Sequence, residues 1–169
     1  MSLVINAETA VASIAGDIDE AHWLTWAEVL KEFAQLEQAT VTVFYTSSGG
    51  DVELALGIYD RIKLFSKTCD KRVEIVANGT IASAATLILQ AADVRMATEH
   101  TQWLIHAGES TAQSAQEKRH NERLDDTYNR IFANRTGLSL RRIKTLHSGE
   151  SYLTTQEALK LNLIDGVLK

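Results

Sequence analysis

Three stretches of the sequence carry residue types that suit nucleophilic catalysis. Tyr45-Thr-Ser-Ser-Gly-Gly-Asp51 contains two adjacent glycines, which let the backbone turn sharply and aim N–H groups at a ligand. Ser83 is expected near the start of a helix, where a helix dipole would stabilise an oxyanion. His106 ends the apolar run Trp103-Leu-Ile-His106, and a histidine can act as general base for a serine nucleophile.

Each stretch also has a structural interpretation. A Ser-Gly-Gly turn is most often only a turn, a serine among alanines usually allows close helix packing, and most histidines that end a strand are structural. The other histidines are expected on or beside polar helical faces, without the spacing of metal ligands, and no metal is predicted; they are His22, His100, His120 and His147. No GxxxxGK[ST] or GxGxxG motif supports nucleotide binding.

Composition limits the class of protein. The chain has 169 residues, 45% of them hydrophobic and 23% charged, with a net charge of −5, which fits one globular domain over residues 1–169 and argues against a nucleic-acid binder. The single cysteine, Cys69, excludes an internal disulfide framework. No secretory signal is expected, and the nearly apolar stretch Ile81 to Leu89 is too short to span a membrane. A cytoplasmic protein without a cofactor is predicted.

Short β-branched runs alternate with segments of helical periodicity, and this alternation predicts an α/β fold with mostly parallel strands. Strands are expected over residues 11–15, 41–46, 73–77, 94–97 and 102–106. Helices are expected over residues 20–37, 52–65, 83–92, 111–134 and 138–147, with a last one opened by the capping box Thr154-Thr-Gln-Glu157. Asn78-Gly79 is expected to end the third strand.

In chain order, these stretches resemble motifs of the ClpP family of serine peptidases. The turn Ser47-Ser-Gly-Gly-Asp-Val52 is similar to that family's S-P-G-G-x-V, Gly79-Thr-Ile-Ala-Ser-Ala84 to its nucleophile motif G-x-A-A-S-M, and Leu104-Ile-His106 to its M-I-H. The resemblance runs from about Val11 to Leu168. The spellings Ser83-Ala-Ala85 and Glu150-Ser-Tyr-Leu-Thr154 are closer to the ClpP-related proteases of phage head maturation than to the housekeeping enzymes.

The resemblance implies a ClpP/crotonase-like spiral of β-β-α units and a serine endopeptidase that works through an acyl-enzyme. Ser83 matches the nucleophile and His106 the general base. Glu150 falls in the column of the third triad member, which is usually Asp, and a glutamate can hold a histidine in the required tautomer. Glu109 is the reserve for that role.

The resemblance also assigns substrate contacts and partners. The backbone N–H groups of Gly50 and Ala84 match the oxyanion donors, and Ser47, Ser48 and Gly49 match part of the edge that binds peptide. Residues of about 107–137 correspond to a shortened handle segment. The expected assembly is a homo-oligomeric ring, typically sevenfold, which acts on peptide or unfolded protein. An AAA+ unfoldase or a phage capsid is the partner that the resemblance implies.

Two other functions remain open from the sequence. A non-catalytic ClpP-like assembly subunit would keep the fold with a degraded triad, and the Asp-to-Glu change is consistent with it. An enzyme of the crotonase type would polarise an acyl-CoA thioester with two backbone N–H groups and needs no serine nucleophile. The combination of Ser83, His106 and Glu150 argues against the crotonase function.

Overall fold

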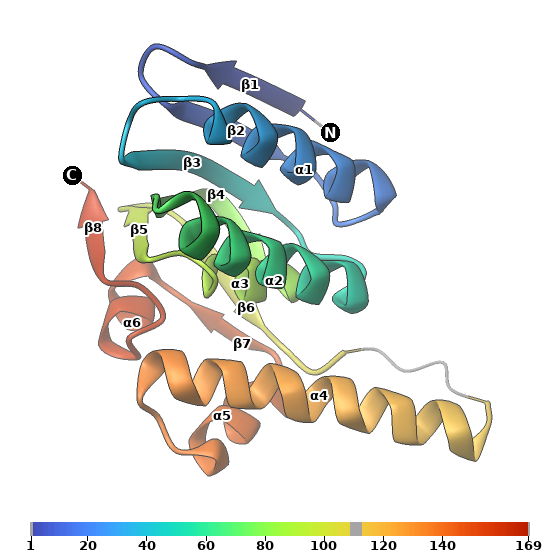
Figure 1. Ribbon diagram of the computed structural model, residues 1–169. Helices are drawn as coiled ribbons and strands as arrows, with labels where there is room; N and C mark the ends of the chain where they lie inside the picture. The colour runs from blue at the N-terminus through green and yellow to red at the C-terminus, as the bar shows by residue number, and fades with distance from the viewer. Residues whose placement is uncertain (1, 109–112, 169) are drawn as a thin grey trace.

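The computed structural model describes residues 2–108 and 113–168, which form one eight-stranded sheet with helices packed against it (Figure 1). In chain order the elements are β1 (Ser2–Asn6), β2 (Val11–Ala15), α1 (Glu20–Ala34), β3 (Thr40–Ser47), α2 (Val52–Cys69), β4 (Arg72–Ala82), α3 (Ala84–Leu89), β5 (Val94–Thr98), β6 (Gln102–Ile105), α4 (Ala115–Thr136), α5 (Leu140–His147), β7 (Ser151–Leu153), α6 (Thr155–Lys160) and β8 (Gly166–Leu168). Helices α1 and α2 lie side by side along the sheet, and α4 runs below it in this view (Figure 1).

The sheet confirms the predicted α/β class with mostly parallel strands. Its main path runs in the order β1-β2-β3-β4-β5-β8, and β6 and β7 branch from β4. The pairs β2–β3, β3–β4, β4–β5 and β5–β8 are parallel, whereas β1 is antiparallel to β2. Strand β6 is parallel to β4 and antiparallel to β7. The branch strands therefore turn away from the main sheet at the end of β4.

Strand β4 does not end at Asn78-Gly79, and that prediction was wrong. Residues 74–77 pair with β5, and after the glycine residues 80–82 pair with β6. Gly79 has φ +67°, a left-handed conformation that glycine adopts without steric cost. The Thr46 hydroxyl accepts a hydrogen bond from the N–H of Thr80 and donates one to its carbonyl, both at 3.1 Å. The glycine is a bend that lets one strand serve two partners.

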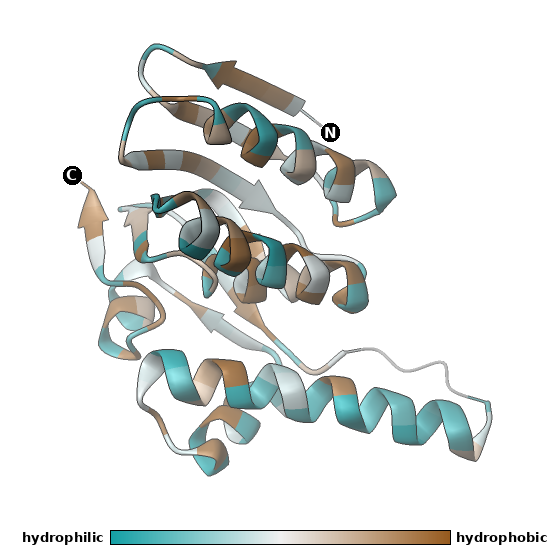
Figure 2. Cartoon of the chain, viewed as in Figure 1, coloured by the Kyte–Doolittle hydropathy of each residue, from teal (hydrophilic) through white to brown (hydrophobic). Residues whose placement is uncertain are grey.

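The core lies between the sheet and its helices. The side chains of β3 alternate between buried and partly exposed, as expected for a strand with one face in the core. All six residues of α3 are buried, so this helix is covered on every side. Figure 2 shows apolar residues along the strands and at intervals along α1 and α2, whereas most of α4 is polar. None of the described helices is both long and apolar enough to cross a membrane.

Some bounds differ from the predictions. Strands β1, β7 and β8 were not predicted; β7 and β8 have three residues each, too few for a periodic pattern. Helix α1 ends at Ala34 rather than residue 37, and α3 ends at Leu89. Residues 111 and 112, where the fourth helix was expected to start, lie outside the described residues. His22 is fully buried, which contradicts its predicted place on a polar face, and its Nε2 accepts a hydrogen bond from the Trp26 indole at 3.3 Å.

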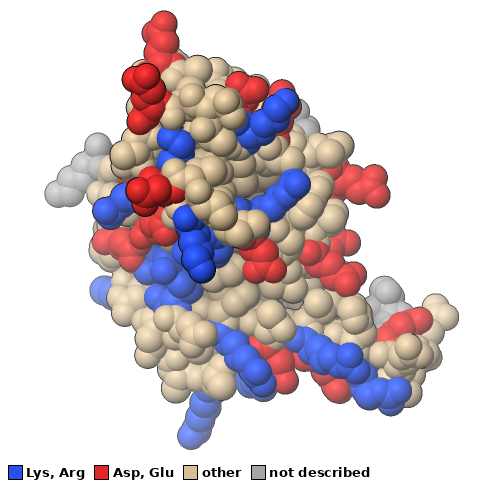
Figure 3. All heavy atoms as spheres, in the orientation of Figure 1, with Lys and Arg blue, Asp and Glu red and all other residues tan. Residues whose placement is uncertain are grey.

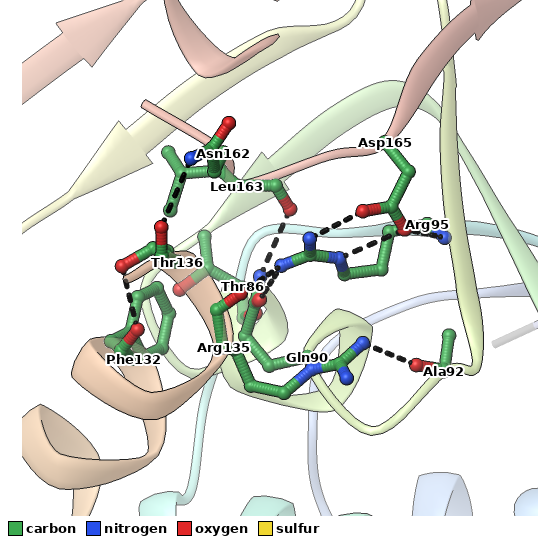
Figure 4. A network of polar contacts seen from close by, with 10 residues as sticks. All are labelled: Thr86, Gln90, Ala92, Arg95, Phe132, Arg135, Thr136, Asn162, Leu163 and Asp165. Carbon is green, nitrogen blue, oxygen red and sulfur yellow. Dashed lines mark hydrogen bonds and ion pairs between the residues drawn. The ribbon is translucent and has the colours of Figure 1, made fainter. Parts of the chain in front are cut away.

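A buried arginine joins the end of α3 to the C-terminal part of the chain (Figure 4). The Arg95 guanidinium donates to Asp165 through Nε at 3.1 Å and Nη2 at 2.5 Å, and to Oε1 of Gln90 at 2.6 Å. Arg135 on α4 donates to the carbonyl of Ala92 at 2.6 Å. Burial would raise the pKa of Asp165, but the hydrogen bonds from the Arg95 side chain and N–H outweigh it, and the pKa is lowered. These contacts fix α3, which follows Ser83, against β5 and α4.

Charged side chains are unevenly distributed over the surface. In Figure 3, Lys and Arg gather along the lower part of the visible face, where Figure 1 places α4 and α5, with Asp and Glu interleaved. Helix α4 contains most of this charge in the sequence. Its inner face instead contributes Tyr128, Asn129 and Phe132, all buried. The helix therefore has a charged outer surface and a buried inner face.

Candidate active site

Ser83 occupies a strained turn between β4 and α3. Its φ of +53° and ψ of −131° lie outside the regions that a non-glycine residue favours, and such backbone strain concentrates at functional sites. The Ser83 N–H donates to the carbonyl of Leu104 at 2.8 Å. The Ser83 carbonyl accepts from the Thr86 hydroxyl at 2.6 Å and from the Tyr128 hydroxyl at 3.2 Å. Contacts from β6, α3 and α4 thus hold the serine backbone in place.

His106 directly follows β6, and the parallel pairing of β6 with β4 brings it to the serine. Ala82 is opposite Leu104 in this pair, so both strands end at the same edge of the sheet. Ser83 and His106 line the same two clefts, of about 430 and 460 Å³. The structure therefore brings together the predicted nucleophile and the predicted base, although they are 23 positions apart in the sequence.

The glycine pair after β3 lies against the serine. Gly49 has φ +103°, and a Cβ there would come within 2.6 Å of the Ser83 Cβ. Gly50 has φ +141°, and a Cβ there would come within 2.4 Å of the Ile18 carbonyl oxygen. Neither position has space for a side chain. Both conformations also favour glycine, so the sequence Gly-Gly is required by this close approach.

The other predicted substrate contacts lie around this turn. Ser47 is buried, and its Oγ accepts a hydrogen bond from the Gly49 N–H at 3.1 Å. The Ser48 hydroxyl is exposed and bonds to the Asp17 carboxylate. Gly50 lines the second cleft and Ala84 lines the first, each together with Ser83. The two residues predicted to donate to the oxyanion therefore flank the serine.

Glu150 lies apart from the residues that line the two clefts. Its side chain is exposed, and its carboxylate accepts a hydrogen bond from the Tyr152 hydroxyl at 3.2 Å. The antiparallel ladder of β6 with β7 ends at the pair of Ile105 with Ser151, and His106 and Glu150 are the next residues beyond that pair. Glu109, the reserve for this role, lies outside the described residues.

A buried pair of polar residues in the first cleft was not predicted. His147 at the end of α5 is only 6% exposed, which contradicts its predicted place on a polar face. Its Nδ1 is 2.6 Å from Oδ1 of Asn129. Its ring packs edge-on against Tyr128 and Phe132. Burial, and to a smaller extent the nearby His106, lower the pKa of His147 to about 4. His147 is therefore neutral at pH 7.

The spacing of α4 contains the signal that could have revealed this pair. Leu124, Asp125, Tyr128 and Asn129 recur at three and four positions and line the first cleft. That pattern marks one helical face, but it mixes apolar, aromatic and acidic residues. The sequence therefore gave no reason to place the face beside Ser83. Among the described residues, no three His, Cys, Asp or Glu side chains are grouped so as to hold a metal ion.

A serine on a strained strand-to-helix turn, beside a histidine in the same clefts, is an arrangement typical of serine hydrolases. The sequence model of the Clp protease family matches residues 7–169. The chain therefore belongs to the Clp protease family, and it is a serine-type endopeptidase. This membership selects the peptidase over the acyl-CoA enzyme that the sequence had left open.

Individual relatives agree with this membership. The chain is 32% identical over 165 residues to the ATP-dependent Clp protease proteolytic subunit of Paracoccus denitrificans, covering 92% of this chain and 80% of the relative. It is 26% identical over 162 residues to the ATP-dependent Clp protease proteolytic subunit 2 of Pseudomonas aeruginosa, covering 92% and 79%. A mutant of ClpP1 from Listeria monocytogenes has the same fold, with a TM-score of 0.86, 24% identity and coverage of 96% of this chain and 93% of that one.

Proposed function

We propose that the protein hydrolyses peptide bonds with Ser83 as nucleophile and His106 as general base. The observation that supports this proposal is that both residues line the same two clefts. His106 takes the hydroxyl proton as the Ser83 Oγ attacks the amide carbonyl carbon, and it gives this proton to the leaving amine. The acyl group is then bound to Ser83 as an ester. His106 next deprotonates a water molecule, which attacks the ester carbonyl. The bond to the Ser83 Oγ then breaks, His106 returns the proton to this oxygen, and the peptide leaves with a new carboxylate.

The proposed oxyanion donors are the backbone N–H groups of Gly50 and Ala84. Each residue lines a cleft next to Ser83, so the two N–H groups approach from different loops. One such donor is worth roughly 3 kcal/mol in a serine peptidase. The peptide lies along Ser47, Ser48 and Gly49, where it gains main-chain hydrogen bonds.

Glu150 is the proposed third member of the triad. The pairing of β6 with β7 supports this role, because His106 and Glu150 each lie one residue beyond the last pair, Ile105 with Ser151. The hydrogen bond from Tyr152 competes for the same carboxylate. Replacing Tyr152 by Phe is therefore expected to raise kcat a few-fold, since an exposed hydrogen bond of this kind contributes roughly 1 kcal/mol. Replacing Glu150 by Ala is expected to lower kcat by about 10⁴-fold.

The active assembly is proposed to be a cytoplasmic homo-oligomeric ring that degrades peptides or unfolded protein. The curated relatives are named as ATP-dependent Clp protease proteolytic subunits, which supports an AAA+ unfoldase as partner; a phage capsid is the alternative partner. Exposed leucines on adjacent helices, Leu24 at 65% and Leu64 at 60%, supply apolar surface for contacts between subunits. Helix α4 occupies most of the handle-equivalent segment.

Labelling with a fluorophosphonate probe tests the chemistry directly. Peptide mass mapping should find the adduct on Ser83 in the wild-type protein and no adduct in Ser83→Ala or His106→Ala. Peptide hydrolysis should fall on the order of 10⁶-fold in Ser83→Ala. Ser13→Ala, at an exposed strand position, is the matched control and should retain labelling and hydrolysis. An adduct at another serine would contradict the assignment.

A non-catalytic assembly subunit is the second candidate. The hydrogen bond from the Tyr152 hydroxyl to Glu150 favours it, because this contact occupies the carboxylate that would orient His106. This function predicts a folded ring, measured by native mass spectrometry, that neither reacts with the probe nor hydrolyses peptides. Restoration of labelling in Glu150→Asp would identify the third residue as the reason for the loss.

A further inference from the structure

Most of the charged side chains that line the two clefts beside Ser83 are carboxylates. The first is lined by three carboxylates and one ammonium group, from Glu122, Asp125, Asp126 and Lys144. The second is lined by Asp51, Glu53 and Asp125, and no lysine or arginine is among its described lining residues. Asp125 is shared by both clefts. Any substrate side chain that enters beside the serine therefore meets a negatively charged wall.

Most of these carboxylates already have a partner. Asp126 forms an ion pair with Lys144 at 3.1 Å. In the second cleft, the Asp51 side chain caps α2 by accepting the N–H of Leu54 at 2.9 Å. Glu53 contacts the imidazole of His120 at 3.1 Å. These contacts occupy three of the acidic groups with the protein's own donors.

Among the described residues, no hydrogen bond or ion pair to the carboxylates of Glu122 and Asp125 is found, and of these two only Asp125 lines both clefts. Partial burial and the adjacent charge of Asp126 raise its pKa, and Lys144 opposes this only in part. The negative charge of Asp125 is thus less well stabilised than that of a fully solvated aspartate. A cation held close to it would remove that unfavourable interaction.

His147 supplies a second, independent feature of the same cleft. Its Nδ1 faces the amide oxygen of Asn129, so Nδ1 is the donor and Nε2 is left as an acceptor. Nε2 is buried and has no hydrogen-bond partner among the described residues. An unpaired buried acceptor is costly, and a donor from a ligand would satisfy it.

The walls between these groups are apolar. Val52 and Leu124 line both clefts, and Ala84 and Tyr128 line the first. Lysine and arginine combine an apolar stem with a charged end, and they bury the stem while the charge meets a polar group. The arrangement of an apolar wall, an unpaired carboxylate and a buried acceptor matches that side chain.

The geometry points to a specificity site for a lysine or arginine of the substrate, next to the bond that is cleaved. The methylene stem packs on Val52 and Leu124, and the charged end pairs with Asp125 and donates to Nε2 of His147. This inference rests on the proposed peptidase function, whose substrate class it defines. The expected substrates are basic segments of unfolded polypeptide.

Fluorogenic peptides that differ at one residue test this specificity. Lysine, norleucine and glutamate are placed in turn at the residue whose carbonyl is attacked; norleucine keeps an apolar stem without the charge. The kcat/KM for lysine should exceed that for norleucine by about tenfold or more, in line with a charged hydrogen bond, and should exceed that for glutamate by a larger factor. The ratio should decrease as salt is added, because Asp125 is exposed on one side. Equal rates for lysine and norleucine would overturn the inference.

Substitutions test which residues of the cleft cause the preference for lysine over norleucine. Asp125→Asn should lower the lysine-to-norleucine ratio toward one, and Asp125→Lys should favour glutamate. Asp60→Asn removes the same charge from an exposed position outside both clefts and should leave the ratio as in the wild type. A ratio that is unchanged in Asp125→Asn would refute the role of Asp125. His147→Phe, which retains a ring but not the acceptor, should also lower the ratio.

A binding measurement separates this inference from the peptidase proposal. Fluorescence anisotropy of the same peptides with Ser83→Ala reports on the cleft without any chemistry. Tighter binding of the lysine peptide, together with an absence of fluorophosphonate labelling in the wild type, would support the cationic site and contradict the peptidase. Labelling at Ser83 with equal binding of the lysine and norleucine peptides would contradict the site and leave the peptidase in place.

Discussion

Acid is expected to destabilise the fold through His147, and the structure gives the size of the effect. Burial lowers the pKa of this histidine to about 4 from the usual 6.5. As the pH falls below 6.5, the unfolded chain binds a proton that the folded protein still excludes. The free energy of unfolding therefore decreases between pH 6.5 and pH 4, by about 3 kcal/mol in all. Below pH 4 both states are protonated, and this contribution stops changing.

Urea unfolding at a series of pH values, followed by circular dichroism, measures this effect. Other groups also titrate, since the pKa of buried His22 is lowered as well, so the comparison is with His147→Gln. The difference in unfolding free energy between the wild type and this variant should shrink by about 3 kcal/mol from pH 7 to pH 4. Phe33→Leu, a cavity variant in the core of α1, should differ from the wild type by an amount that does not change with pH. A constant difference for His147→Gln would refute the reasoning.

Two further substitutions test other contacts. Gly50→Ala places a Cβ against the Ile18 carbonyl oxygen at 2.4 Å. It should lower the free energy of unfolding by about 1–3 kcal/mol and kcat/KM by about 100-fold. Gly149→Ala is the control: no atom lies within 4 Å of the added Cβ, and the melting temperature should be unchanged. Asp165→Asn leaves the Arg95 guanidinium buried without a carboxylate. Because the Asp165 side chain is 42% exposed, the free energy of unfolding, measured with urea, should fall by only about 2 kcal/mol. In the wild type this contribution is present above pH 4 and is lost as the pH falls through the lowered pKa of Asp165.

The sequence predicted those parts of the fold that have a local cause. Periodic segments gave the main helices, and β-branched runs gave β2 to β6. It did not predict that β4 continues past Gly79, because the bend is stabilised by Thr46 of the neighbouring strand. Strand β8 has only three residues and is held by pairing with β5. Elements that depend on such distant partners leave no periodic pattern in the chain.

The sequence likewise predicted only part of the candidate site. Ser83, His106 and the glycine pair were predicted because their residue types and their order along the chain match a known chemistry. The pair of Asn129 and His147 was not, because it joins α4 to α5 and exists only after these helices pack. Burial turns a histidine on a strongly polar segment into a neutral group next to the nucleophile. Helical periodicity alone does not show which face of α4 that cleft uses.

The contacts of Asp165 tie the C-terminal segment to the sheet. Removing residues after Asn162 would strip β5 of its neighbour β8 and leave the guanidinium of Arg95 without its anion. Asp165 is therefore released only when its hydrogen bonds to buried Arg95 break. Digestion by a carboxypeptidase past Asp165 should then report how often this contact opens, so trimming of these few residues can serve as a clock for local opening of the sheet edge.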